Sequence, residues 1–532
     1  MHLPGLSRAA IRRPLTVVAA TALLCGVAPA ALAQAVATAP TVASGMSQEQ
    51  ALALTARLDA LEKRNEELED RVADLKAQVA ASEQAIREEQ HATTVSMNNG
   101  RPAIGTGDGQ TTVAFRGVFQ LDAAHYDQRA PGPLATDFRR GSVGDATEAD
   151  HARDLNDGAN FRRMRFGVEG KAFGDWNYNF LYDFGGSGVE EAGKITSAWV
   201  EYAGFAPLRL RIGAFSAPAG IEEVTNSNGS LFPERAAPSE LVRSIASGDG
   251  RKAVALYGNG ERWNASAALT GGIVTTQTFD QQSAFVGRVA FLPVKGLDYL
   301  VHVGANATVV FHPAAGGPDI SPGGAVTALR LRDRPELRVD ITRLVDTGNI
   351  DAEGLKLLGL ELAGHLRALS LQGEYFHIGV QRRASALSDP TFTGWYLQGA
   401  WSLTGEPRRY NIASASFDPP RADKNFNLKT GDLGVWELAA RYSDLDLNHH
   451  AGALGSALPA DAIRGGEQKI LALGLNWYPN PTVRFLADYQ RVSVDRLSPG
   501  GTAFGAGALT PSAGVQIGQD LSIWSLRTQY AF

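Results

Sequence analysis

The chain has 532 residues, of which 44% are hydrophobic, with a mean hydropathy of −0.13 and a formal net charge of −6. This balance excludes a helical membrane protein and a disordered chain, and the lack of basic blocks argues against a nucleic-acid partner. The 58 glycines and the 8% of aromatic residues are typical of many short strands joined by turns, which favours an all-β fold.

Residues 1–33 have the pattern of a secretory signal peptide. A basic start precedes an apolar stretch over 15–31 that ends in Ala31-Leu32-Ala33, the small-residue signal for cleavage. Twin-arginine export through Arg12-Arg13 is the less favoured alternative to ordinary secretion. No later stretch reaches about 18 apolar residues, so a mature chain that enters a bilayer must do so as a closed barrel.

A continuous helix is predicted over 47–90, because no glycine or proline interrupts these residues. Apolar residues follow one another at alternating steps of three and four, which indicates a periplasmic coiled coil. The a and d positions are Ala51, Leu54, Leu58, Leu61, Asn65, Leu68, Val72, Leu75, Val79, Ser82 and Ile86. Leucine at most d positions and Asn65 at an a position favour a parallel dimer, whereas a trimeric barrel would impose threefold symmetry. The alternative is a lone amphipathic helix folded onto the barrel.

After a predicted linker over 91–110, residues 111–532 change to an alternation of period two. Charged residues keep to one parity and apolar residues to the other, as in strands with one face toward water and the other toward lipid. The pattern predicts a transmembrane antiparallel β-barrel of about sixteen strands. The clearest segments are 111–123, 161–172, 176–184, 208–215, 263–270, 285–291, 299–307, 337–341, 357–363, 369–376, 395–403, 436–443, 471–478, 483–491 and 521–532.

Aromatic residues at the strand ends separate a membrane barrel from a soluble sandwich, because membrane barrels carry aromatic girdles at both lipid interfaces. We expect the girdles to be formed by Trp176, Tyr182, Trp199, Tyr202, Trp395, Trp401, Trp436, Tyr442, Trp477, Tyr478, Tyr489, Trp524 and Tyr530. The last strand ends in a terminal phenylalanine, Phe532, which is similar to the insertion signal of outer-membrane proteins. The predicted location is therefore the bacterial outer membrane.

Several motifs between Trp395 and Tyr489 resemble those of the phosphate-selective porin O and P family. They are Trp395-Tyr396, Leu403-Thr404-Gly405-Glu406-Pro407-Arg408-Arg409-Tyr410, Trp436-Glu437-Leu438 with Arg441-Tyr442, and Leu473-Gly474-Leu475-Asn476-Trp477-Tyr478. Upstream matches are Phe161-Arg162-Arg163, Gly167, Glu169-Gly170, Asp175-Trp176, Tyr182-Asp183-Phe184 and Gly213 with Phe215. The resemblance implies a sixteen-stranded homotrimeric barrel whose third long loop folds inward and narrows the pore.

That loop should follow Phe215 and include 221–226 and 232–235. Phosphate-binding members of the family place lysines and an arginine where this chain has Glu223, Asn228, Asn177 and Val118. The paired arginines of the family are kept as Arg162 and Arg163, so the resemblance carries over part of an anion site but not phosphate selectivity.

Candidate site residues come from this loop and from strand parity. For the constriction and its anion contacts we expect Arg162, Arg163, Arg165, Arg235, Glu222 and Glu223. For a ladder of arginines along the lumen wall we expect Arg116, Arg209, Arg211 and Arg441, joined by Arg288, Arg338, Arg484 and Arg527. Arginine suits phosphate and carboxylate because its planar guanidinium forms paired hydrogen bonds. The alternative role for each arginine is to neutralise a neighbouring carboxylate.

The sequence therefore predicts a porin that passes small polar or anionic solutes, with phosphate and polyphosphate among the candidates. The alternative is a structural anchor in which the barrel tethers the coiled coil to the cell wall, with peptidoglycan as the partner. An enzyme is not expected, because no GxSxG motif marks a nucleophile. No cofactor and no metal site are expected either, and His449 and His450 should be solvated in a loop.

Overall fold

A computed structural model describes residues 47–98, 100–129, 155–185, 193–274, 280–316, 327–500 and 512–532. The described residues fall into two compact units that divide between Arg87 and Glu88, near the end of the first helix. The predicted signal peptide, 1–33, lies outside the described residues.

The first unit is the helix α2, Gln48–His91, which confirms the helix predicted over 47–90. It begins with reciprocal hydrogen bonds, since Gln50 donates its backbone N–H to the Ser47 hydroxyl and Ser47 donates its N–H to the Gln50 side chain, both at 3.3 Å. The apolar residues of the predicted seam are about half exposed, from 48% at Val72 to 58% at Leu61. Of the helices described here, none combines the length and apolar character needed to cross a bilayer.

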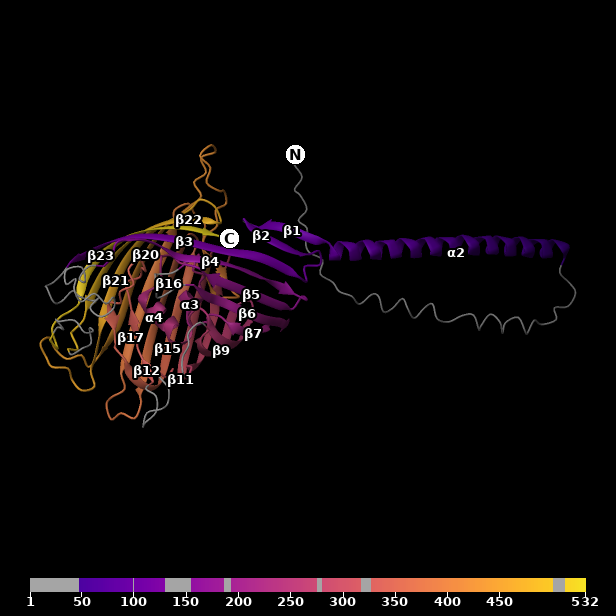
Figure 1. Cartoon of the computed structure of the whole chain (residues 1–532). Helices are drawn as coiled ribbons and strands as arrows, with labels where there is room; N and C mark the ends of the chain where they lie inside the picture. Colours follow the sequence, from indigo (N-terminus) through magenta and orange to yellow (C-terminus); the bar gives the residue numbers. More distant parts are fainter. Residues whose placement is uncertain are drawn as a thin grey trace. The chain divides into compact units, whose positions relative to one another are not determined.

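The second unit is a ring of sixteen antiparallel strands, which confirms the predicted barrel (Figure 1). The wall strands are β3 (Thr112–Arg129), β4 (Gly158–Ala172), β5 (Trp176–Asp183), β6 (Lys194–Phe205), β7 (Leu208–Ala214), β8 (Arg251–Asn259), β9 (Trp263–Ile273), β10 (Ser283–Lys295), β11 (Tyr299–His312), β15 (Ile350–Leu366), β16 (Leu369–Arg382), β17 (Thr391–Ser402), β20 (Val435–His449), β21 (Ile463–Tyr478), β22 (Val483–Asp495) and β23 (Gln519–Ala531). Each strand pairs with the next, and β23 closes the ring on β3 from Asp520↔Arg129 to Ala531↔Val118. The closed ring satisfies the backbone polar groups within the wall, as hydrocarbon requires.

The two faces of the wall follow the predicted parity. In β15, Leu358, Leu360 and Leu362 are more than half exposed on the outer face, whereas Glu361, between two of them, is 4% exposed. Strand ends carry stacked aromatic pairs, such as Trp436 with Trp477 at 5.3 Å between ring centroids. Alternation therefore places the leucines against lipid and the carboxylates inside the barrel.

Two predicted girdle residues lie inside the barrel instead. The Tyr478 ring is buried and its hydroxyl donates to Glu437 at 3.2 Å. Trp199 lies beneath the Arg211 guanidinium, 4.0 Å from the ring centroid. Both share the parity of an inward-facing neighbour, Tyr478 that of Asn476 and Trp199 that of Glu201.

Two segments differ from the predicted elements. Residues 91–110, predicted as a linker, contain the hairpin of β1 (Thr93–Asn98) and β2 (Arg101–Thr106), and β2 pairs with the start of β3. Residues 337–341, predicted as a strand, lie in the β11–β15 connection between β13 (Arg332–Asp333) and β14 (Val345–Asp346). This segment imitates a strand because its side chains also alternate between an apolar and a charged environment.

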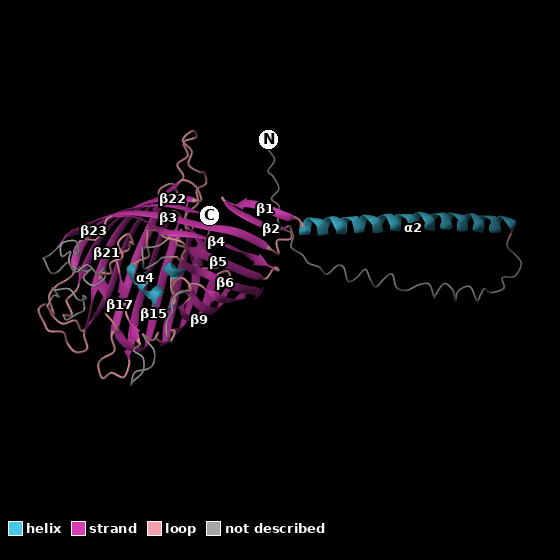
Figure 2. Cartoon of the chain, viewed as in Figure 1, coloured by secondary structure: helices cyan, strands magenta, loops and turns pink. Residues whose placement is uncertain are grey.

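Three connections enter the barrel interior, and Figure 2 shows the helix α4 of one of them among the strands. The β7–β8 connection carries the helices α3 (Ile221–Val224) and α4 (Ala237–Ala246), and the β11–β15 connection carries β12 (Ala328–Leu329), β13 and β14. The β17–β20 connection enters from the opposite rim with β18 (Arg409–Asn411) and β19 (Ser416–Asp418). The β7–β8 connection is the third long loop, and it folds inward as the resemblance implies.

Candidate pore constriction

The helix α4 has an apolar side and a charged side. Pro238 lies in its first turn, where a missing N–H has no cost. Leu241, Val242 and Ile245 are buried against the barrel core, whereas Glu240 and Arg243 border an open cavity. The helix thereby presents charge to the lumen while its apolar side fixes the loop to the wall.

A wall carboxylate holds the start of the loop. Glu374 of β16 accepts the backbone N–H groups of Ile221 at 2.8 Å and Glu222 at 3.3 Å, together with the Tyr396 hydroxyl at 2.8 Å. Gly220 has a φ of 149°, and a Cβ there would lie 2.3 Å from the Glu374 carboxylate. Glycine is required at this position because both the backbone conformation and the space exclude a side chain.

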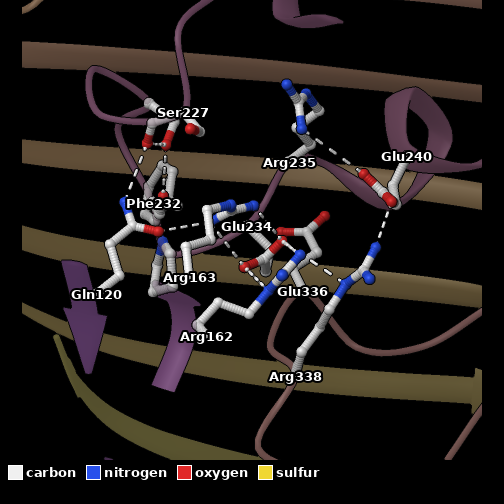
Figure 3. A network of polar contacts seen from close by, with 12 residues as sticks. Gln120, Arg162, Arg163, Ser227, Phe232, Glu234, Arg235, Glu240, Glu336 and Arg338 are labelled. Atoms are coloured by element: carbon white, nitrogen blue, oxygen red, sulfur yellow. Dashed lines mark hydrogen bonds and ion pairs between the residues drawn. The ribbon is translucent and has the colours of Figure 1, made fainter. Parts of the chain in front are cut away.

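Figure 3 shows the network around Glu234, a residue of the β7–β8 connection. Arg162 binds its carboxylate through two nitrogens, at 2.7 and 3.1 Å. Further guanidinium nitrogens reach the same carboxylate from Arg163 at 3.3 Å, Arg527 at 3.2 Å and Arg338 at 3.7 Å. Four cations thus meet one buried anion, and Asp122 adds a second anion bound to Arg527.

The balance of these forces keeps Glu234 ionised. Burial alone raises the pKa of this loop carboxyl, but attraction to Arg162, Arg163, Arg338 and Arg527 outweighs it and holds the pKa well below its ordinary value. The charged carboxylate can therefore join strands β4 and β23 to two inward connections.

A cavity of about 660 Å³ runs beside this network. The wall residues of the cavity come from strands β3 to β10. They include Lys194, at the rim where β6 begins, and Arg209, near the opposite rim, where β7 begins. Its arginines are Arg116, Arg162, Arg163, Arg165, Arg209, Arg211, Arg235, Arg243, Arg251, Arg288, Arg332, Arg334, Arg338 and Arg343. Among its described lining residues, fourteen arginines and one lysine compare with four carboxylates, those of Glu223, Glu240, Asp249 and Asp333.

The β17–β20 connection packs inside the barrel against strands β10 and β20. Arg408 binds Glu437 at 2.8 Å and donates to the backbone oxygen of Gly229 at 2.9 Å. Arg288 donates to the backbone oxygens of Ser414 and Ala415, at 2.9 and 2.8 Å, while it is paired with Glu361. This packing leaves the open volume along the β3–β10 side.

Eight of the ten predicted site residues border the cavity, all except Glu222 and Arg441. The wall pairs are Arg165 with Asp183 at 2.7 Å, Arg116 with Glu169 at 3.1 Å, and Arg211 and Arg209 with Glu201 at 2.7 and 3.9 Å. The loop pairs are Arg235 with Glu223 at 3.4 Å, Arg441 with Glu222 at 3.4 Å, and Arg441 with Glu336. Arg338 reaches the lumen from a connection rather than from the strand predicted for it.

Sequence parity alone misses part of the cavity lining. Lys194, Arg243, Arg251, Arg332, Arg334 and Arg343 were not among the candidates. Most of the missed arginines lie on the inward connections, where strand parity has no meaning. The dense arginine spacing over 330–343 is the signal that could have found three of them.

Comparison with known proteins decides the family. The model of the family described as phosphate-selective porin O and P matches residues 135–500. The chain belongs to the phosphate-selective porin O and P family. It is a porin of the bacterial outer membrane, a channel and not an enzyme.

Proteins similar to this chain include two porins and a further outer-membrane protein. Porin O of Pseudomonas aeruginosa is 27% identical over 420 residues, which cover 72% of this chain and 91% of the relative. An anion-selective porin from Comamonas acidovorans is 12% identical, with 79% of this chain and 100% of that chain covered and a TM-score of 0.44. OmpT of Vibrio cholerae, solved in its trimer form, is 11% identical, with 79% and 99% covered and a TM-score of 0.42.

Three of the four positions where the resemblance implies lysine or arginine hold paired or buried groups. Asn177 donates to Glu201 at 3.1 Å, and Glu223 pairs with Arg243 at 2.5 Å. Val118 is 2% exposed in β3. The cationic character of this cavity therefore comes from arginine with a single lysine.

The pH dependence of the pore should come from Asp333, which lies in the β11–β15 connection and borders the cavity. Burial and repulsion from Glu240 raise its pKa to about 8. The carboxyl is thus neutral at pH 7 and becomes anionic above pH 8, so the anion-to-cation permeability ratio should fall between pH 7 and pH 9. Reversal potentials in a salt gradient measure this ratio.

The Asp333→Asn variant should lose this fall, because its side chain cannot ionise. Asp298→Asn, at an exposed turn of the other rim, should keep it. A wild-type ratio that stays constant from pH 7 to pH 9 would contradict the assignment.

Proposed function

We propose that this porin passes small polar and anionic solutes and prefers anions. The observation that carries the proposal is the charge of the cavity lining, in which fifteen cationic side chains accompany four carboxylates. Carboxylates just outside the lining pair with its arginines and neutralise part of this charge, but an excess of arginine remains; they are Glu169, Asp183, Glu201, Glu234 and Glu361.

Arginine in a narrow lumen favours oxyanions for two reasons. A solute that passes the constriction loses part of its hydration shell, and side-chain donors must replace the lost water. Guanidinium groups offer paired donors that match the oxygens of phosphate and carboxylate, and they stay charged at all physiological pH values. The inward loop brings these groups close enough to act together.

Phosphate and polyphosphate are the first solutes to test, because the family is described as phosphate-selective and Porin O is a relative. The departures at Glu223, Asn228, Asn177 and Val118 mean that any phosphate affinity has to come from arginine. Phosphate should then reduce the chloride current in a concentration-dependent way, whereas a neutral sugar should not.

The wall arginines that are open to the cavity should set the selectivity. Arg209 and Arg211 have side chains that are 25% and 21% exposed. Changing both to glutamine removes two cations and leaves Glu201 as a net anion, so the anion-to-cation permeability ratio should fall at least about twofold. Reversal potentials in a potassium chloride gradient across a planar bilayer measure the shift.

A matched control removes two arginines outside the cavity. Arg330 and Arg383 pair with Asp346 and Asp351 on exposed connections, so Arg330→Gln with Arg383→Gln changes the net charge equally. The control should keep the wild-type reversal potential. An unselective wild-type channel, or equal shifts of the reversal potential in both double variants, would contradict the proposed anion preference. A barrel that never conducts would favour the anchoring role.

We also propose that the porin is a homotrimer whose α2 helices form a periplasmic coiled coil, with peptidoglycan as the candidate partner. The support is the exposed apolar seam of α2, because a single helix in water gains nothing from a continuous stripe of leucine and valine. Asn65 within this seam would fix the register of the strands of the coil.

Light scattering of the detergent complex tests the assembly, and three chains per particle are expected. Leu68→Glu, at the centre of the seam, should reduce the helical circular dichroism at 222 nm while the barrel keeps its mass. Asp70→Glu, off the seam, is the control. A single chain per particle would refute the trimer, and an unchanged helical signal in Leu68→Glu would indicate a lone helix.

A further inference from the structure

Two histidines and an aspartate meet at the barrel rim that carries the long connections. His449, His450 and Asp461 each offer one ligand atom, and these three atoms lie within 4.8 Å of one another. His450 Nδ1 is 2.8 Å from an Asp461 oxygen, and the two imidazole rings are stacked with centroids 4.0 Å apart. None of these residues takes part in the cavity described above.

The chain brings the three groups together by a sharp turn. His449 ends β20, and His450 follows with a φ of 47°, in the left-handed region that residues other than glycine rarely adopt. The connection then returns, so that Asp461 lies two residues before β21 and faces the same point. This turn therefore brings two imidazoles and a carboxylate to one point.

A fourth oxygen lies at the same place. The Ser388 hydroxyl, from the β16–β17 connection, is 2.7 Å from an Asp461 oxygen and 3.1 Å from His449 Nε2. The cluster therefore offers two nitrogens, one carboxylate oxygen and one hydroxyl. Two imidazoles with one carboxylate are a ligand set that zinc prefers, with a fourth position for water or a hydroxyl.

We propose that His449, His450 and Asp461 bind a divalent transition-metal ion, with Zn²⁺ as the best match, and that Ser388 or water completes the coordination. Tetrahedral zinc at about 2.0 to 2.2 Å from each ligand needs ligand atoms about 3.4 Å apart. The present separations, up to 4.8 Å, would have to contract by roughly an ångström or more, through rotation of the exposed His450 side chain and smaller shifts of the half-buried His449 and Asp461.

One nearby cation opposes the site. Arg382 donates to the backbone oxygen of Asp461 at 2.9 Å, so it fixes the end of the connection but also repels a metal ion. We therefore expect moderate affinity for the metal ion. A bound ion would link the β20–β21 connection to the β16–β17 connection at the rim of the pore.

Zinc titration of the untagged mature protein in detergent tests the site. Isothermal calorimetry with zinc chloride in metal-free buffer should show one ion per chain, and cobalt chloride should give the visible absorption of a four-coordinate ion. His449→Ala and His450→Ala should each weaken zinc binding at least tenfold, in line with the 10- to 100-fold losses that follow removal of even supporting groups around a metal.

The control is a pair at the same rim that lacks a second histidine. His125 Nδ1 lies 2.6 Å from Asp157, and His125→Ala should leave zinc binding unchanged. Asp461→Asn keeps the side-chain shape and guards against a folding defect, and heat-modifiable gel mobility reports whether each barrel is folded. Absence of saturable one-to-one binding in the wild type, or wild-type affinity in the folded His449, His450 and Asp461 variants, would overturn the proposal.

Discussion

The constriction depends on one buried interaction, the contact between the Glu234 carboxylate and the guanidinium groups around it. Arg162 and Arg163 come from β4, Arg527 from β23 and Arg338 from a second inward connection. Removing one partner of a buried pair usually costs about 3 to 5 kcal/mol, because the remaining charge stays in a dry site. These contacts hold the β7–β8 loop to β4 and β23, the two strands that flank β3 where the ring closes.

The packing of the inward connections gives the Glu234 contact its consequence for function, because it determines where open volume remains in the barrel. Two further connections occupy part of the interior and border the open volume, whose wall runs along β3 to β10, where most of the arginines lie. Pairing with wall carboxylates holds many of these guanidinium groups in place, and the remaining excess of positive charge acts on the solute. Structural and solute-binding roles of arginine are therefore shared in one network, and the paired arginines Arg162 and Arg163 belong mainly to the structural part.

Period-two alternation was enough to predict the barrel, since lipid and lumen impose opposite chemistry on successive residues, and continuous heptads were enough to predict α2. The same alternation misled over 337–341, because Leu337 packs in the core while Arg338 reaches Glu234, without any strand pairing. Contacts such as Arg162 to Glu234 span 72 residues, and only the closed ring brings them together. Strands β6 and β8 were missed because alanine and glycine dilute their alternation.

Single-channel recording of Glu234→Gln in 1 M potassium chloride tests the role of the Glu234 contact most directly. Salt at this concentration reduces the screening length to about 3 Å, so a change in surface charge alone has little effect on the current. The account predicts a larger and noisier conductance, because the uncompensated arginines repel one another and release the loop. A folded Glu234→Gln barrel with the conductance and noise of the wild type would contradict it.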